Sequence, residues 1–448
     1  MGMGWRMGYR VSGSLFLKDI GMKNDSYFGQ RLSRRALLGA GLAGIGVNGV
    51  MGGVLSGALT GARLAGVPLA LGQVAQAMAA DAAAKDRILV VVELSGGNDG
   101  LNTLVPYGDD AYYKHRPTLG IRPNKLLKID DHFGWNAGMS GFEKLYKDGK
   151  LAVIHGCGYE QPSFSHFTSM AYLHTAAPNG GDPYGWVGRL GDALQPTVTP
   201  NLIVNIDVAQ SLAVQSRVHV PVVFDDPERF KRKGSFQEAR QLDIVTQVAN
   251  DANASRAYLR EAAKSAVDAS ALVREAWARY RTPVDYGILP LGLPKVAALM
   301  DAGLPTRLYY TGFRNNAFDT HVQQPDLHGR LLTYASDAIM GFMRDLERIG
   351  KADQVAVLVF SEFGRRVPEN ANQGTDHGTA NSMFIIGKQV KGGHYGKPVN
   401  LTQLDAGDNL MHTTDFRRAY ATLTRGWMGY EDTAKVLKGE FEPFAVFG

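Results

Sequence analysis

Acidic and imidazole side chains recur in this sequence directly after its apolar runs or in the loops that follow them. Carboxylate oxygens and imidazole nitrogens are the ligands that Zn²⁺, Mn²⁺ and similar divalent ions take, and several such ligands can hold two ions side by side. The sequence therefore predicts a centre for one or two divalent ions, either Zn²⁺ or one of Mn²⁺, Mg²⁺ and Ca²⁺. The candidate ligands are Asp99, Asp319, His321, Glu362, Asp376 and His377.

Each of these residues also has an ordinary structural interpretation. Asp99 could cap a helix that begins near Leu101, because an aspartate at a strand-to-helix turn accepts from free backbone N–H groups. Polar residues also fill turns. An Asx turn could account for Asp319 and His321, an ion pair with Arg365 or Arg366 for Glu362, and a tight loop for Asp376 and His377. The joint recurrence of acid and histidine favours the metal site.

The elements that would position these side chains are buried strands alternating with helices. Continuous apolar runs at 86–94, 150–156 and 354–364 indicate strands covered on both faces, with shorter candidates at 201–207 and 383–387. Helical spacing marks 139–149 and 331–350. The alternation predicts an α/β fold in which helices sandwich a mostly parallel sheet. Ligands bind beyond the carboxyl ends of such strands, which is where the polar residues lie.

One domain is expected over residues 80–448, with an insertion at about 200–285. Residues 201–227 are rich in valine with short polar breaks, which indicates a β-hairpin or a small cap. Residues 243–280 have apolar side chains at helical spacing and predict one long helix or two. Cys157 is the only cysteine, so no intramolecular disulfide can form and the core must hold the fold together.

The basic charge of the chain is concentrated at its N-terminus. Residues 1–79 carry eight lysines and arginines against two aspartates, so this segment contributes +6 to a formal net charge of +5 and the remainder is about −1. A nucleic-acid-binding surface would need lysine and arginine clustered on the folded domain. We therefore expect no nucleic-acid partner.

Residues 31–47, RLSRRALLGAGLAGIGV, place Arg34 and Arg35 directly before a long apolar run. This segment resembles a twin-arginine (Tat) export signal. Arg63 and Pro68 interrupt the apolar region, which disfavours a permanent membrane span. The resemblance implies that residues 1–79 are a leader, cleaved or disordered, and that the Tat export machinery recognises Arg34 and Arg35. The expected location is periplasmic or extracellular.

Six motifs run through the chain from residue 89 to about residue 429. They are GGNDGLNTLVPY, SFSHFTSMAYLHTA, FDTHVQQ, VFSEFGRRVPEN, GTDHGTANSMFIIG and TTDFRRAYATLTRGWMG. In number and order these motifs resemble DUF1501, a family of exported bacterial proteins of unknown function. The resemblance covers nearly all of the chain after the leader.

A more distant resemblance is to the alkaline phosphatase superfamily, which includes sulfatases, nucleotide pyrophosphatases and cofactor-independent phosphoglycerate mutase. It implies an alkaline-phosphatase-like domain in which Asp99 is a metal ligand, Asp319 and His321 bind one ion, and Asp376 and His377 bind the other. Ser165 in PSFSHF takes the place of the nucleophile, with Ser163 as the alternative.

The chain departs from the superfamily pattern where the acid of a DHG motif should end a strand. Glu362 stands there, and Asp376 and His377 follow about a dozen residues later. Either Glu362 is the ligand and the later pair supports it, or all three contribute. Arg365 and Arg366 could clamp a substrate oxyanion through bidentate contacts. The histidines near Ser165, His166 and His174, are expected to pack or to hydrogen-bond rather than to catalyse.

The function implied is an exported, metal-dependent hydrolase of small anionic phosphate or sulfate esters, with catalytic residues Ser165 and Arg365. The alternative is a non-catalytic scaffold or binding protein of the envelope that keeps the same fold, because a fold alone does not establish an activity.

Overall fold

The computed structural model describes residues 86–230 and 254–448 of the 448-residue chain. The expected leader, with Arg34 and Arg35, lies outside these residues. No helix within the described ranges is both long enough and apolar enough to span a bilayer.

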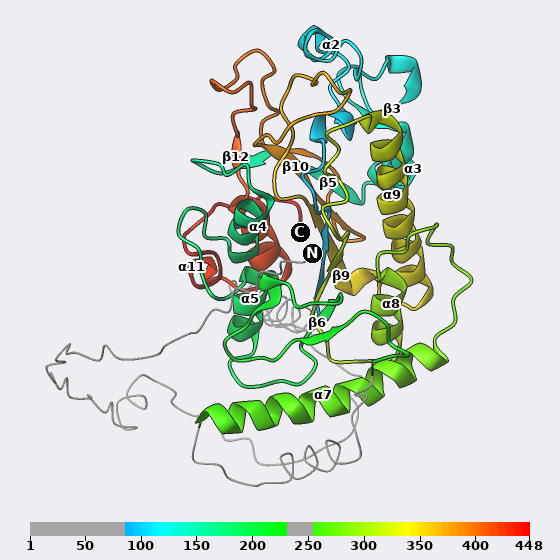
Figure 1. Cartoon of the computed structure of the whole chain (residues 1–448). Coiled ribbons are helices and arrows are strands. Elements are labelled where there is room, and N and C mark those ends of the chain that lie inside the picture. Colours follow the sequence, from blue (N-terminus) through cyan, green and yellow to red (C-terminus); the bar gives the residue numbers. More distant parts are fainter. Residues whose placement is uncertain (1–85, 231–253) are drawn as a thin grey trace, which may run out of the picture. The chain divides into compact units, whose positions relative to one another are not determined.

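The described residues are organised around a nine-stranded sheet (Figure 1). Along the sheet the strands are β11 (Gly393–Tyr395), β5 (Leu151–Gly158), β10 (Asn381–Gly387), β9 (Val355–Phe360), β1 (Ile88–Glu93), β8 (Leu308–Gly312), β6 (Ile203–Ile206) and β7 (Val222–Phe224), while β12 (Thr414–Asp415) also pairs with β5. Only β10 is antiparallel to its neighbours in this order. The carboxyl ends of β1, β5, β8 and β9 therefore meet at one edge of the sheet.

The central strand β1 shows why these runs are apolar throughout. Leu89 and Val91 pack into the core on one face of the sheet, whereas Val90 and Val92 pack into the core on the other face. Side chains alternate along a strand, so a strand covered on both faces needs apolar residues at every position. Burial of each such side chain contributes about 1.5–3 kcal/mol.

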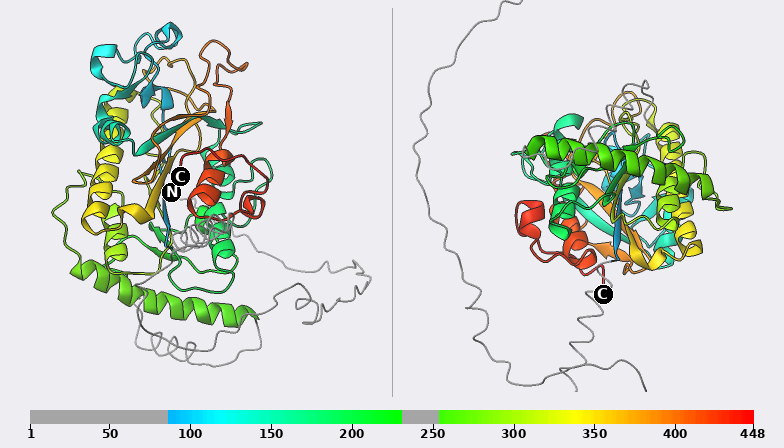
Figure 2. Two further views of the ribbon diagram at one scale, coloured as in Figure 1. Left: turned by 180° about the vertical axis from the view of Figure 1, so that it is seen from behind. Right: turned by 90° about the horizontal axis from the view of Figure 1, so that it is seen from below.

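Helices cover both faces of the sheet (Figures 1 and 2). One face packs against α3 (Ser140–Lys147), α8 (Leu293–Asp301) and α9 (Gln324–Arg348), and the other against α4 (His166–Thr175), α5 (Trp186–Leu194), α10 (Arg417–Ala421) and α11 (Thr433–Leu437). The mostly parallel sheet sandwiched by helices is thus confirmed. A small sheet of β2 (Leu104–Val105), β4 (Gly134–Asn136) and β3 (Leu126–Lys128), with α2 (Asp110–His115), lies beside it.

Within the segment expected to form an insertion, the described strands β6 and β7 and a long helix pack with the main sheet and its core. The strands β6 and β7 pair in parallel at the edge of the central sheet, so residues 201–227 do not form a hairpin. The long helix α7 (Ala254–Arg279) directs Ala269, Val273 and Ala276 into the same core as α8 and α9. Their spacing of three and four residues places them on one face of the helix.

Candidate metal centre

The loops at the carboxyl edge of the sheet bring together residues from distant parts of the sequence. His166 begins α4 after β5, Asp319 and His321 lie between β8 and α9, Glu362 follows β9, and Asp376 and His377 lie between β9 and β10. This edge is where open α/β sheets bind ligands.

Asp319 is at the centre of the cluster. Its Oδ1 atom lies 2.9 Å from Nε2 of His321 and 3.0 Å from Nε2 of His377, and its Oδ2 atom lies 3.4 Å from Nε2 of His166. The ligand atoms of His166, Asp319 and His377 all lie within 4.8 Å of one another, a grouping that could hold a metal ion.

The Nδ1 atoms of the three histidines point away from Asp319 toward oxygen acceptors. His166 Nδ1 lies 2.7 Å from Oε1 of Glu362, and His377 Nδ1 lies 2.7 Å from the backbone oxygen of Phe164. His321 Nδ1 lies 3.2 Å from Oδ1 of Asp376. A neutral ring that donates from Nδ1 to such an acceptor has its lone pair on Nε2. Nε2 of His321 and Nε2 of His377 also lie 2.9 and 3.0 Å from the carboxylate of Asp319, so the donor nitrogen of each ring is set by its protonation.

The Nε2 atoms converge. The Nε2 atoms of His321 and His377 lie only 3.0 Å apart, and Nε2 of His166 is buried without a hydrogen-bond partner. Tetrahedral zinc with Zn–N bonds of about 2.0–2.1 Å would separate its ligand atoms by about 3.3 Å. Imidazole nitrogens together with a carboxylate are a donor set that a divalent transition-metal ion takes, and the Nδ1 atoms face oxygen acceptors as those of histidine ligands do in known metal sites.

Asp319 is held ionised. Burial by itself raises the pKa of Asp319, but the hydrogen bond and positive charge of Arg365, whose Nη2 lies 2.7 Å from Oδ1, outweigh burial and lower the pKa to about 2. The acid is thus an anion at neutral pH and is available as an anionic ligand.

The surroundings act differently on two of the imidazoles. Burial lowers the pKa of His166, but the hydrogen bond to Glu362 and its negative charge outweigh burial and leave that pKa above its usual value. For His377 burial dominates, and its pKa is lowered. Neutral imidazole, the form that binds metal, is therefore favoured at His377 by the fold itself.

Two glycines allow the loops to come this close. Gly96, in the loop after β1, has φ of +114°, and a Cβ atom there would lie 2.6 Å from the backbone nitrogen of Asp319. A Cβ atom on Gly374 would lie 2.1 Å from the backbone of His321. Gly96 thus allows the close approach of the Asp319 backbone to the loop after β1.

The structure gives Glu362 and Asp376 supporting positions around the cluster. Glu362 accepts from His166, from the backbone N–H of Gly96 at 2.8 Å and from Ser361 Oγ at 3.0 Å. Asp376 accepts from Asn370 Nδ2 at 3.1 Å as well as from His321. Both carboxylates contact a histidine through Nδ1, so they orient candidate ligands instead of joining Nε2 around Asp319.

Asp99 lies in a different polar cluster. It is fully buried, and its Oδ2 atom accepts from Arg116 Nη1 at 2.7 Å and from Gln324 Nε2 at 2.6 Å. Its side chain makes no cap bond to the following helical turn. Burial raises the pKa of Asp99, but the charge of Arg116 outweighs it and leaves the pKa below its usual value. The residues whose ligand atoms group within 4.8 Å are His166, Asp319 and His377, so we leave Asp99 out of the candidate centre, although its Oδ1 atom is buried without a hydrogen-bond partner.

Arg365, predicted to clamp substrate, is likewise engaged within the protein. Its buried guanidinium donates to the backbone oxygens of Gly96, Gly97, Phe318 and Thr375 and to the carboxylate of Asp319. Each of its three nitrogens, Nε, Nη1 and Nη2, donates to at least one of these acceptors. The geometry makes Arg365 a residue that fixes Asp319 and the loop after β1.

Ser165 is exposed and lies between two residues that contact the cluster. Phe164 accepts from His377, and His166 is one of the three converging imidazoles. As the residue before α4, Ser165 would be expected to cap the helix, yet its hydroxyl makes no cap bond. Ser163 Oγ, by contrast, accepts from the backbone N–H of Ser165 at 3.2 Å. Of the two hydroxyls, that of Ser163 accepts a backbone hydrogen bond and that of Ser165 makes no cap bond.

Sequence reasoning missed His166 as a member of the cluster. Its position directly after the candidate nucleophile was the available signal, but a lone histidine gives no indication of which loop it faces. Sequence reasoning also missed a second polar group, at the end of β1. Oε2 of Glu93 lies 2.9 Å from Nε2 of His174 and accepts from the hydroxyl of Tyr310. The same hydroxyl lies 2.8 Å from Nε2 of His174.

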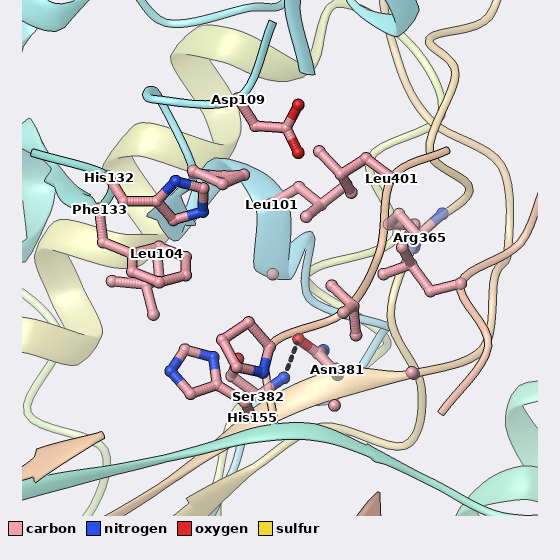
Figure 3. Close-up of a pocket in the computed structure, with 17 residues that line it drawn as sticks. Leu101, Leu104, Asp109, His132, Phe133, His155, Arg365, Asn381, Ser382 and Leu401 are labelled. Atoms are coloured by element: carbon pink, nitrogen blue, oxygen red, sulfur yellow. Dashed lines mark hydrogen bonds between the residues drawn. The ribbon is translucent and has the colours of Figure 1, made fainter. Parts of the chain in front are cut away.

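A separate recess lies between the small sheet and the loops near residues 398–410 (Figure 3). Its volume is about 40 Å³, and Asp109, His132, His155, Arg365, Asn381 and Ser382 interrupt an otherwise mostly apolar lining. Burial, followed by the effect of His394, lowers the pKa of His155 to about 3. The recess has room for a few atoms only, which makes it a poor candidate for the main substrate site.

Several solved structures are similar to this chain at low sequence identity. The lipoteichoic acid synthase LtaP from Listeria monocytogenes has 11% identity and a TM-score of 0.35, with 75% of this chain and 76% of that chain covered. The phosphonate monoester hydrolase SpPMH from Silicibacter pomeroyi has 10% identity and a TM-score of 0.35, with 77% and 73% covered. The C-terminal periplasmic domain of EcEptC from Escherichia coli, in complex with Zn, has 10% identity and a TM-score of 0.33, with 80% and 88% covered.

Because these TM-scores are low, we argue function from the residues of this chain. No curated protein matches its sequence. The family model described as "Protein of unknown function (DUF1501)" matches residues 86–438, a span that contains every residue of the candidate centre. The chain therefore belongs to the DUF1501 family.

Proposed function

We propose that this protein is a metal-dependent hydrolase of phosphate or sulfate esters with Ser165 as its nucleophile. The observation that carries the proposal is the convergence of three imidazole Nε2 atoms on Asp319, one of them from His166, the residue that follows Ser165. Three nitrogens and one carboxylate favour Zn²⁺ over Mg²⁺ or Ca²⁺, which prefer oxygen ligands. His166, His321, His377 and Asp319 would hold the ion.

A divalent ion at this position would supply positive charge against the oxygens of the bound ester. The protein itself contributes the first turn of α4, whose backbone N–H groups lack intrahelical partners and favour an anion. Arg365 keeps Asp319 ionised and fixed. Glu362, Asp376 and the carbonyl of Phe164 fix the three rings.

The chemical step is nucleophilic substitution at phosphorus or sulfur. Ser165 Oγ forms a bond to that atom, the bond to the alcohol oxygen breaks, and the alcohol leaves with a proton. Water then attacks the phosphoserine or sulfoserine, which releases inorganic phosphate or sulfate and restores the hydroxyl. The exposure of Ser165 and its lack of a cap bond leave the oxygen open to substrate.

The test combines turnover with trapping of the serine ester. Wild type, Ser165→Ala and Ser163→Ala are assayed with aryl phosphates, a phosphodiester and an aryl sulfate, after metal removal and after addition of Zn²⁺, Mn²⁺, Mg²⁺ or Ca²⁺. We expect Zn²⁺-dependent turnover that Ser165→Ala abolishes and Ser163→Ala largely keeps, with a modified Ser165 detected by mass spectrometry. If wild type binds no metal and hydrolyses none of these esters under any condition, the result would falsify the proposal that the protein is a hydrolase.

The second candidate is a non-catalytic exported scaffold or binding protein of the envelope. Its support is that Asp99 and Arg365, which a two-metal hydrolase would use, are engaged in buried contacts. Bound metal without turnover of any ester, and without modification of Ser165, would favour this role.

Export is a further part of the proposal. Its support is the pair Arg34 and Arg35 before the apolar run at 36–47. Replacement of both arginines by lysine should retain the protein inside the cell, as measured by fractionation, whereas the same replacement at Arg6 and Arg10 should not. Equal export of both double variants would contradict the Tat route.

A further inference from the structure

A hollow of about 350 Å³ adjoins the candidate metal centre. Its lining includes residues 158–162, which lead directly into Ser163, Ser165 and His166, and also Phe363 and Thr379, which follow Glu362 and His377 in sequence. Phe363 joins the two sites, because its ring centroid lies 5.0 Å from those of both His166 and His377. A substrate whose anionic group reaches the centre would have its remaining part in this hollow.

The size and polarity of the hollow fit the alcohol part of a small ester. Its volume is in the range of small-molecule sites. Pro162, Leu410 and the half-exposed Met411 give it apolar surface, and Tyr159 and Phe363 add aromatic residues. The hydroxyl of Tyr159 also accepts from the backbone N–H of Ser163 at 3.1 Å, so the wall of the hollow is tied to the nucleophile loop.

The charge in the hollow is negative. Among the described residues, the lining contains Glu160 and Asp405 but no lysine or arginine. Arg366 acts on Asp405 from outside the lining, so its charge offsets that acid. Glu160 is highly exposed, and Nε2 of His412 lies 3.6 Å from its Oε1 atom. Glu160 is therefore the charge in excess.

We infer that the substrate of this site is an ester whose alcohol part is uncharged or cationic and partly apolar, and that Glu160 selects against polyanions. The inference rests on the proposed function, and it names the substrate class of the same site. Carboxylates at the rim of a cleft repel anions and raise the local concentration of cations, and aromatic faces add to the attraction of an organic ammonium group. Nucleotide polyphosphates and highly sulfated glycans would be poor substrates.

The experiment uses matched phenyl phosphates and phenyl sulfates that carry either a trimethylammoniomethyl or a sulfomethyl group at the para position. The methylene keeps the leaving-group electronics similar while the charge is reversed. For wild type we expect kcat/KM to be roughly two- to fivefold higher for the cationic ester, the size typical of an exposed charge. Glu160→Lys should abolish or reverse this ratio, and Glu160→Gln should reduce it.

The matched control is Asp301→Lys, because Asp301 is an exposed acid at the end of α8 that does not line the hollow. This variant should keep the wild-type ratio. An anionic ester used as well as the cationic one by wild type, or a ratio that Glu160→Lys leaves unchanged, would overturn the inference.

A binding measurement separates this inference from the proposed chemistry. If no ester is hydrolysed, the proposed function fails, and nuclear magnetic resonance titration with benzyltrimethylammonium and benzenesulfonate still tests the hollow. Tighter binding of benzyltrimethylammonium than of benzenesulfonate, with the difference lost in Glu160→Lys, would support the charge selectivity of the hollow. Equal binding of the two probes, or binding that ignores Glu160, would contradict it.

Discussion

The Nε2 atoms of His321 and His377 lie 3.0 Å apart, while the Nδ1 atom of each ring faces an oxygen acceptor. When both neutral rings donate from Nδ1, their Nε2 lone pairs face each other, an arrangement that a cation between them would stabilise. The carboxylate of Asp319 adds a negative charge at the same point. This relationship is the physical reason to expect a bound ion.

The first prediction concerns metal content. Purified wild type should bind about one Zn²⁺ per chain, because the cluster offers four ligands around one point. His321→Ala removes a partly exposed ligand and should reduce the bound metal toward zero, as measured by elemental analysis after dialysis. His132→Ala removes an exposed histidine outside the cluster and should leave metal content unchanged. Two ions per chain, or equal metal in both variants, would disagree with the geometry.

The second prediction separates orientation from ligation at Glu362. Since Glu362 holds His166 through Nδ1, Glu362→Gln should weaken Zn²⁺ binding about 10- to 100-fold without abolishing it. The affinity is measured by competition with a chromogenic chelator. Glu143→Gln, on the outer surface of α3, is the control with no expected effect. A loss as complete as that of His321→Ala would instead make Glu362 a direct ligand.

The third prediction tests the placement of Asp99. Arg116 and Asp99 form an ion pair with no exposed side-chain surface, so Asp99→Asn leaves a buried guanidinium without its counter-charge. The free energy of unfolding should fall by about 3–5 kcal/mol in urea titrations. Metal content at a temperature where the variant is folded should stay at the wild-type level. Loss of metal with little loss of stability would return Asp99 to the ligand set.

The fourth prediction concerns stability at acidic pH. Burial lowers the pKa of His155 to about 3, whereas an unfolded histidine titrates near 6.5. Below about pH 6.5 the unfolded chain takes up a proton that the folded protein rejects, so the contribution of His155 is fully present above that pH and declines as the pH falls toward 3. The expected slope from this group is at most about 1.4 kcal/mol per pH unit.

The measurement is urea unfolding at several values between pH 7 and pH 4. His155→Asn should lower stability at pH 7 and flatten the slope, whereas the exposed His132→Asn should do neither. An unchanged slope in His155→Asn would show that other groups dominate acid unfolding.

Much of the fold was predictable because burial on both faces leaves a continuous apolar run. The strands β1, β5 and β9 follow directly from such runs. The orientation of β10 was not predictable, since an antiparallel strand in the middle of a sheet is as apolar as its parallel neighbours. The parallel pairing of β6 with β7 was also not predictable, because short valine-rich segments give no indication of strand direction.

The candidate centre was predictable in part, for a similar reason. Asp319 and His321 were expected at one ion and His377 at a second, and the side chains of all three meet at Asp319. Asp99 has the residue type of a ligand, but only the folded chain reveals that Arg116 turns back to pair with it. The roles of His166 and Glu362 could not be predicted, since the sequence does not specify which nitrogen of a ring an acid will contact.

The candidate ligands come from three loops that are distant in sequence; His377, for example, contacts Phe164, 213 residues away. An ion held by Asp319 and the three histidines would therefore cross-link these three loops at the carboxyl edge of the sheet. A cross-link of this kind stabilises only the folded chain, and the free energy of unfolding that it adds grows with the concentration of free ion. Zinc supply would then set the lifetime of the folded protein as well as any activity.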